Sequence, residues 1–184
     1  MQKKLFLSLF LVGLAWLIEA CFCESAKYPF YDFHRLQVTC RQEVVAKDSI
    51  WGFDVRVDSV KYVASVYQTV LTTPAFGTSC PEPGENGPKY EPTQIKIFAD
   101  KDFNDTLKAG ASLNSIFYAY DQTQSLAVSK AAGKIGLYLY PGIYDFIYTP
   151  YLPKDTSLTY DITIRITKSN AEEVDGVVKG VKFK

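Results

Sequence analysis

The sequence predicts an all-β protein, an immunoglobulin-like antiparallel β-sandwich with one short helical turn. Apolar and polar side chains alternate every two residues in several segments, most regularly over 158–167, as in strands with one buried face. The chain holds 13 Tyr and 12 Phe, and flat or branched side chains of this kind pack well on a pleated surface. No long segment has the 3.6-residue period of a helix, which disfavours architectures that alternate strands and helices.

The chain begins with the features of an export leader. Lys3 and Lys4 precede an apolar run over 5–18, and Ala20 supplies a small residue before a cleavage point. The run is shorter than the roughly 20 apolar residues that a transmembrane helix needs. We therefore expect a secretory signal peptide, with Cys21 directly after Ala20 as the site of lipid attachment.

These features divide the sequence into three parts. Residues 1–20 are the predicted signal peptide, 21–33 carry the lipid-attachment cysteine and a tether, and 34–184 form a single β-sandwich domain. Removing 1–20 takes two of the 20 basic and one of the 20 acidic side chains, which leaves 18 and 19. A nearly neutral protein has no general attraction for nucleic acid, so nucleic acid is not an expected partner.

The first strands are predicted over 34–41, 51–58 and 60–71, the last segment forming one or two strands. Within 51–58 the larger apolar side chains share one face: Trp51, Phe53, Val55 and Val57. The following segment, 73–92, contains five prolines and three glycines, so it is expected to be a long connection.

A strand over 95–99 is expected to end in a turn over 100–105. A helical turn is expected over 113–117, with the hydroxyl of Ser112 as its N-cap. The remaining predicted strands cover 125–128, 134–140, 144–148, 158–167 and part of 174–183. On the strand over 158–167 the expected buried side chains are Leu158, Tyr160, Ile162, Ile164 and Ile166.

Four cysteines offer two kinds of structural link. Cys40 and Cys80 could pair in an oxidising compartment, and closing a loop of about 40 residues would stabilise the fold by roughly 3–4 kcal/mol. If Cys21 carries lipid, an odd set of three thiols is left. A zinc site on Cys21 and Cys23 is disfavoured, because only His34 is left to help in place of a second, correctly spaced pair.

Asp100, Asp102 and Asn104 have the spacing of the first three oxygen ligands in a calcium-binding loop. The EF-hand is rejected, because Asp105 stands where that loop needs glycine and Ala111 where it needs glutamate. A simpler calcium site at a loop between strands is a weak alternative. The favoured interpretation is that these side chains accept hydrogen bonds from their own turn.

The sequence contains no recognisable set of catalytic residues, so we do not expect an enzyme. His34 is the only histidine, and no Gly-x-Ser-x-Gly turn exposes a serine beside it. Nothing in the pattern nominates a pair of carboxylates for glycoside hydrolysis. We predict no cofactor and no metal ion, apart from the weak calcium alternative.

Five tyrosines cluster around a Pro141-Gly142 turn and Pro150. Tyrosine combines an apolar face with a hydrogen-bonding tip, so such a cluster can stack on sugars or contact a peptide. The competing interpretation is that these tyrosines fill strand positions and shield sheet edges. The candidate ligand-binding residues are Tyr138, Tyr140, Tyr144, Tyr148 and Tyr151.

Several short motifs together resemble a family of uncharacterised Bacteroidota lipoproteins of similar length. They are Ile18-Glu19-Ala20-Cys21, Tyr31-Asp32-Phe33, Cys80-Pro81-Glu82-Pro83-Gly84, Ile95-Lys96-Ile97, Asp102-Phe103-Asn104 and the segment over 109–117. The similarity is densest over 80–117. It implies an exported, lipid-anchored, β-rich protein of unknown function, with no catalytic residues to carry over. Glu19 departs from the pattern, since such signals usually carry a small or apolar residue there.

We therefore expect an exported cell-envelope protein that is held to a membrane through a lipid on Cys21 and faces the periplasm or the outside. Its expected role is that of a structural or interaction module. The alternative is an accessory module that binds a glycan or an envelope protein through its loop aromatics.

Overall fold

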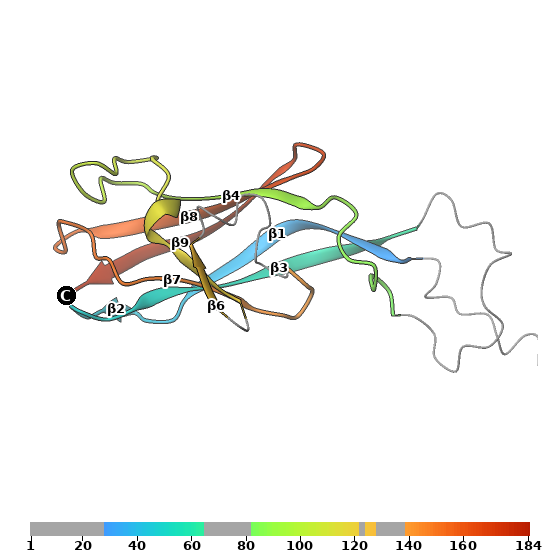
Figure 1. The fold of residues 1–184 in the computed structure, drawn as a ribbon, viewed down its shortest axis with the longest axis horizontal. Helices are drawn as coiled ribbons and strands as arrows, with labels where there is room; N and C mark the ends of the chain where they lie inside the picture. The colour runs from blue at the N-terminus through green and yellow to red at the C-terminus, as the bar shows by residue number, and fades with distance from the viewer. Residues whose placement is uncertain (1–27, 65–81, 122–123, 128–138) are drawn as a thin grey trace, which may run out of the picture. The chain divides into compact units, whose positions relative to one another are not determined.

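The computed structural model describes residues 28–64, 82–121, 124–127 and 139–184 (Figure 1). Side chains are described for these residues except 120–121 and 124–127. The chain divides into two compact units, which are 1–31 with 62–87 and 32–61 with 88–184. The described residues include no helix long and apolar enough to cross a membrane.

The described elements form two β-sheets and a single 3-10 turn, which confirms the all-β prediction. One sheet has the order β1 (Phe30–Cys40), β3 (Trp51–Val63), β7 (Asp145–Thr149), β5 (Tyr118–Asp121) and β6 (Gln124–Ala127). The other has the order β2 (Val44–Val45), β9 (Glu173–Phe183), β8 (Thr159–Lys168) and β4 (Pro92–Ala99). Figure 1 shows β8 and β9 side by side, as their register requires.

The strand pairing is mostly but not wholly antiparallel. β3 and β5 each pair antiparallel with β7, and β8 pairs antiparallel with both β4 and β9. β2 instead pairs parallel with β9, placing Val44 opposite Lys182 and Val45 opposite Phe183. The prediction of a purely antiparallel sandwich is wrong at this ladder, because β2 continues the chain at a sheet edge and is not the return strand of a hairpin.

A buried core of aromatic and branched side chains joins the two sheets. On β8 the two-residue alternation buries Ile162, Ile164 and Ile166 completely, as the sequence predicted. Trp51 on β3 meets Phe183 on β9 edge to face, with ring centroids 5.0 Å apart.

Some predicted boundaries differ from the structure. β1 starts at Phe30, four residues before the expected start at 34, so part of the predicted tether is strand. β3 is one continuous strand from Trp51 to Val63, although Ser59 has a positive φ of 55°. Leu158, expected on the buried face, is exposed because β8 begins only at the next residue.

The predicted helical turn is present as a 3-10 turn, η3 (Asn114–Ile116). Leu113 and not Ser112 is its N-cap, and the Ser112 hydroxyl only accepts a long hydrogen bond of 3.4 Å from the Asn114 amide. The position of the turn is fixed by β4, since the Asn114 side chain accepts from the Ile97 amide at 2.9 Å and donates to the Ile95 carbonyl at 2.8 Å. This tertiary contact explains why the predicted cap is wrong.

The smaller unit includes a turn over 82–87, within the predicted connection over 73–92. Backbone hydrogen bonds join Gly84 to Tyr28, Asn86 to Pro29 and Tyr31 to Gly87, at 2.8–3.0 Å. Gly84 has a φ of +83° and lies against the ring of Tyr31, so glycine is required there.

Candidate functional site

The outer face of the five-stranded sheet carries a row of stacked aromatic rings. β7 turns Ile147 into the core, so Phe146 and Tyr148 point to the opposite side. The rings of Phe146 and Tyr148 stack with centroids 5.4 Å apart. Tyr118, which faces Tyr148 in the β5–β7 ladder, continues the stack at 5.8 Å. We call Phe146, Tyr148 and Tyr118 the aromatic row.

Arginine covers the Phe146 end of the aromatic row. The guanidinium carbon of Arg41 lies 3.7 Å from the centroid of Phe146, which is a close cation–π contact. Nε and Nη2 of Arg41 also donate to the carboxylate of Asp54 at 2.9 and 2.6 Å, and this hydrogen bond raises the pKa of Arg41. Asp54 faces Phe146 in the β3–β7 ladder, so one charged pair is held against the aromatic row.

Gly52 allows β3 to approach β7 beneath the row. It is the register partner of Tyr148, and a Cβ atom on it would lie 2.2 Å from the Ile147 carbonyl oxygen and 2.8 Å from the Tyr148 Cβ. Real Cβ atoms do not approach backbone oxygen so closely. A side chain at this position would therefore push the two strands apart.

The stacking limits what the row can bind. The ring of Phe146 has the Arg41 guanidinium over it and stacks on Tyr148, and Tyr148 also stacks on Tyr118. A sugar ring would need an open aromatic face. The row can instead present ring edges and tyrosine hydroxyls, beside a fixed guanidinium group.

The predicted tyrosines are only partly brought together. Tyr148 belongs to the aromatic row, and Tyr144 is 53 % exposed with the guanidinium of Arg56, an outward residue of β3, 5.1 Å from its ring centroid. Tyr140 is half-buried, Tyr151 is exposed beyond the end of β7, and Tyr138 lies outside the described residues.

A second group of polar side chains lies where β1 meets the turn between β8 and β9. Lys168 is the last residue of β8, and its side chain has no exposed surface. Its Nζ donates to Asp32 Oδ1 at 2.7 Å, to Glu172 Oε2 at 2.8 Å and to the Phe33 carbonyl at 2.9 Å. All three ammonium hydrogens thus have an acceptor, which buried charges require.

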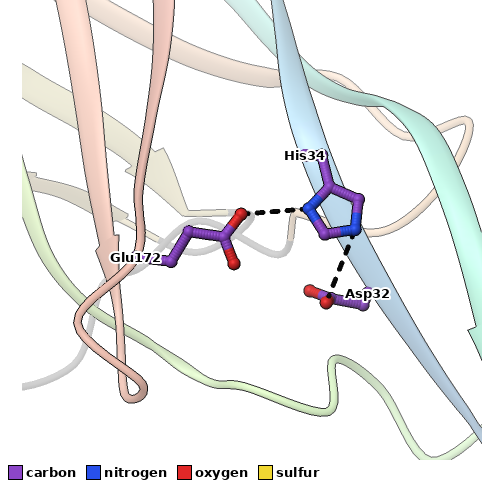
Figure 2. A group of neighbouring side chains, drawn as sticks. All are labelled: Asp32, His34 and Glu172. Atoms are coloured by element: carbon purple, nitrogen blue, oxygen red, sulfur yellow. Dashed lines mark hydrogen bonds and ion pairs between the residues drawn. The ribbon is translucent and has the colours of Figure 1, made fainter.

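His34 lies beside the same two carboxylates (Figure 2). Its Nδ1 is 3.0 Å from Glu172 Oε1, and its Nε2 is 3.6 Å from Asp32 Oδ2. Hydrogen bonds from Lys168, then from His34, lower the pKa of Glu172 from 4.5 to about 2. We call Asp32, His34, Lys168 and Glu172 the Lys168 cluster.

The Lys168 cluster has ligand atoms for a metal ion, but it already contains a cation. One atom each from Asp32, His34 and Glu172 lie within 4.8 Å of one another, which is close enough to surround an ion. The ammonium of Lys168 contacts both carboxylates, however, and would repel a divalent cation placed between them. The Lys168 cluster is best described as a network of ion pairs that joins β1 to the β8–β9 turn.

The three calcium candidates already accept hydrogen bonds from backbone amides. Asp102 accepts from the Ala109 amide and from Lys108 Nζ, both at 2.9 Å, and the bond from Lys108 lowers the pKa of Asp102. Asn104 Oδ1 accepts from the amides of residues 106 and 107, and Asp100 Oδ1 accepts from the amide of residue 161. The bonds of Asn104 are those of its own turn, whereas Asp100 bonds to β8.

The cysteine predictions rest mainly on residues outside the described ones. Cys40, at the end of β1, is half-buried and forms no disulfide with a described residue, and burial raises the pKa of its thiol. Cys21 and Cys80 lie outside the described residues, so lipid attachment and the Cys40–Cys80 pair stay predictions.

No family model, no curated protein and no solved structure matches this chain. The resemblance to Bacteroidota lipoproteins is therefore still a prediction, and the interpretation of the site depends on its geometry alone.

Several residues of these sites were not singled out from the sequence. Lys168 carried a usable signal, because it continues the two-residue alternation of Ile162, Ile164 and Ile166 on the buried face of β8. A lysine at such a position calls for acidic partners. Phe146 and Tyr118 had no comparable signal, since their stacking depends on which strands are neighbours.

Proposed function

We propose that this chain is an exported protein held at the cell envelope by a lipid on Cys21, and that it acts as an interaction module. Its contact surface would be the outer face of the five-stranded sheet, and its partner an envelope protein. The aromatic row with Arg41 is the single observation that carries the proposal.

Tyrosine and arginine are enriched in the central parts of protein interfaces, where they supply contact area together with hydrogen bonds. Rings that are already stacked lose little side-chain entropy when a partner binds. The rings of Phe146 and Tyr148 already stack on their neighbours in the row, which favours a protein partner that contacts edges and hydroxyls over a stacked sugar.

We further propose that the two sheets form an immunoglobulin-like sandwich. In that fold the seven strands A to G are distributed as ABED and CFG. With β2 and β6 set aside as additional edge strands, β1-β3-β7-β5 corresponds to ABED and β4-β8-β9 to CFG. This order of strands supports the proposal.

The contact surface can be tested by site-specific photo-cross-linking in native envelopes. We would place a photo-cross-linking amino acid at Tyr144, beside the row, and at Lys96, an exposed residue of β4 in the other sheet, as the matched control. We expect a cross-linked product of defined mass from position 144 and not from position 96. Equal products from both positions, or none from either, would contradict an interaction surface on this face.

The anchor needs a separate measurement. The intact mass of the protein from its native host should equal that of the chain from Cys21 onward plus attached lipid, and Cys21→Ser should release it from the membrane fraction. An unprocessed mass would contradict export, whatever the cross-linking shows.

A glycan is the second candidate ligand, and Tyr144 is the observation in its favour, because this exposed ring lies outside the row. A glycan array with the wild-type protein and Tyr144→Ala distinguishes the two candidates. Specific signals lost in the variant would favour the glycan, and no signal would leave the protein partner.

A further inference from the structure

Arg56 lies on the same outer face as the aromatic row but is not a member of it. It is a half-buried residue of β3, which lies between β1 and β7 in the five-stranded sheet. Its Nε donates to Gln37 Oε1 on β1 at 2.7 Å, and its guanidinium carbon is 5.1 Å from the ring centroid of Tyr144, just before β7. Neighbours on both sides thus hold the guanidinium group of Arg56 in place.

Arg41 and Arg56 are alike in their aromatic contact and differ in their charge partner. Arg41 lies over Phe146 and forms an ion pair with Asp54. Arg56 forms no ion pair with any described carboxylate, and the side chain that accepts from its Nε is a neutral glutamine. Its terminal nitrogens, Nη1 and Nη2, have no acceptor among the described residues. They are the donors with which arginine binds an oxyanion in two places.

The two aspartates that flank Arg56 on the outer face of β3 are already engaged. Asp54 accepts from Nε and Nη2 of Arg41 at 2.9 and 2.6 Å. Asp58 Oδ1 accepts from the next backbone amide at 2.9 Å, and its Oδ2 lies 3.8 Å from Nε of Arg35. Neither aspartate therefore neutralises Arg56.

This part of the face carries one positive charge in excess. Residues 35–41 and 52–58 contain three arginines and two aspartates as their only charged side chains, so three minus two leaves one. The two ion pairs involve Arg35 and Arg41, which places the excess at Arg56. A carboxylate brings one negative charge and balances it, whereas a phosphate monoester brings about 1.5–2. The charge on this face therefore favours a carboxylate.

We propose that the envelope protein bound at this face places one aspartate or glutamate carboxylate on Arg56. The carboxylate would accept hydrogen bonds from Nη1 and Nη2 and lie beside the exposed ring of Tyr144. This inference rests on the proposed function and adds the charge that the partner must carry. Arg56 then selects the partner, because a protein without the carboxylate would cover the guanidinium group and leave it unpaired.

Photo-cross-linking from position 39 in native envelopes tests the role of Arg56. Thr39 is an exposed residue of β1, and replacing it leaves Gln37 and Tyr144 unchanged. We expect Arg56→Gln to lower the yield of the cross-link by about tenfold or more, while its unfolding in urea stays close to that of the wild type. Arg35→Gln is the matched control, because it removes the same charge from the same face, and its yield should stay within about twofold of the wild type.

A charge exchange identifies the group on the partner. Arg56→Glu should abolish the cross-link, and changing one aspartate or glutamate of the cross-linked protein to arginine should restore most of it. Phosphatase treatment of the envelopes should leave the yield unchanged.

Four results would overturn the inference while the wild-type cross-link, and with it the proposed function, persists. They are an undiminished yield in Arg56→Gln, an equal loss in Arg35→Gln, no restoration by any charge exchange, and loss of the product after phosphatase treatment. Absence of the wild-type product from positions 39 and 144 alike would instead contradict the proposed function and this inference together.

Discussion

The ammonium of Lys168 lies 2.7 Å from the carboxylate of Asp32, although 136 residues separate the two in the sequence. Asp32 lies near the start of β1, and Lys168 is the last residue of β8. The pair therefore joins the two sheets at the end where β8 turns into β9. It also explains how a lysine is tolerated on a face that otherwise carries only apolar side chains.

Replacing Lys168 by methionine should destabilise the protein by about 3–5 kcal/mol, because it leaves the Asp32 carboxylate buried without its partner. The free energy of unfolding from urea titrations measures this loss. The double variant Lys168→Met with Asp32→Leu should recover part of it. Lys154→Ala is the control, since Lys154 pairs with Asp105 at the exposed surface and such pairs contribute little to stability. Equal losses of unfolding free energy in Lys168→Met and Lys154→Ala would show that the buried pair contributes no more to stability than a surface pair.

The lowered pKa of Glu172 predicts a loss of stability in acid. In the folded protein this pKa is about 2, against 4.5 for the free group, so between these values the unfolded chain binds more protons. The contribution of Glu172 is therefore complete above pH 4.5 and is lost as the pH falls toward 2. Urea unfolding at several pH values from 7 to 2.5 should show a shallower acid loss in Glu172→Gln than in the wild type. If the free energy of unfolding falls equally steeply with pH in both proteins, the ion pair of Glu172 does not stabilise the fold.

The two-sheet fold follows from local patterns, because alternation over 158–167 and 51–58 reflects one buried face and needs no knowledge of neighbours. The positions at which strands and turns begin and end depend more on contacts between residues that are distant in the sequence. Phe30 belongs to β1 although Pro29 precedes it, and the position of η3 depends on hydrogen bonds from Asn114 to β4. Such contacts form only after the strands have come together.

The site was predictable only in part for the same reason. Tyr148 and Tyr144 could be proposed from their spacing around a turn, but the aromatic row also needs Tyr118 from another strand and Arg41 from the end of the first. Glycine at position 52 gave no signal, because its role appears only when β3 lies against β7. Sequence spacing thus identified single members of the surface and not their arrangement.

Gly52→Ala should cost about 3 kcal/mol or more, since the new Cβ would lie 2.2 Å from a backbone oxygen of β7. Gly110→Ala is the matched control, because it has a positive φ but open space around the added atom and should cost only about 1–2 kcal/mol. Urea unfolding compares the two. If the Gly52 variant is as stable as the Gly110 variant, β3 and β7 are not in close contact there.

Calcium at millimolar concentration should leave the melting temperature unchanged, because Asp100, Asp102 and Asn104 already accept hydrogen bonds from backbone amides. Differential scanning fluorimetry with and without calcium measures the shift. A rise of several degrees that disappears in Asp102→Ala would instead establish a calcium site in this loop.

Arg41→Lys separates binding from stability on the aromatic face. The exposed pair of Arg41 with Asp54 and its contact with Phe146 should each contribute no more than about 1 kcal/mol to folding. Lysine keeps the charge but has no planar fork to lie on the ring while donating twice to one carboxylate. We therefore expect nearly wild-type unfolding in urea and a much lower yield of the cross-link from position 144. Arg165→Lys is the control, because Arg165 also donates two hydrogen bonds to one aspartate, on β9 of the other sheet, and should not change the cross-link. An unchanged yield in Arg41→Lys would show that the guanidinium group plays no part in recognition.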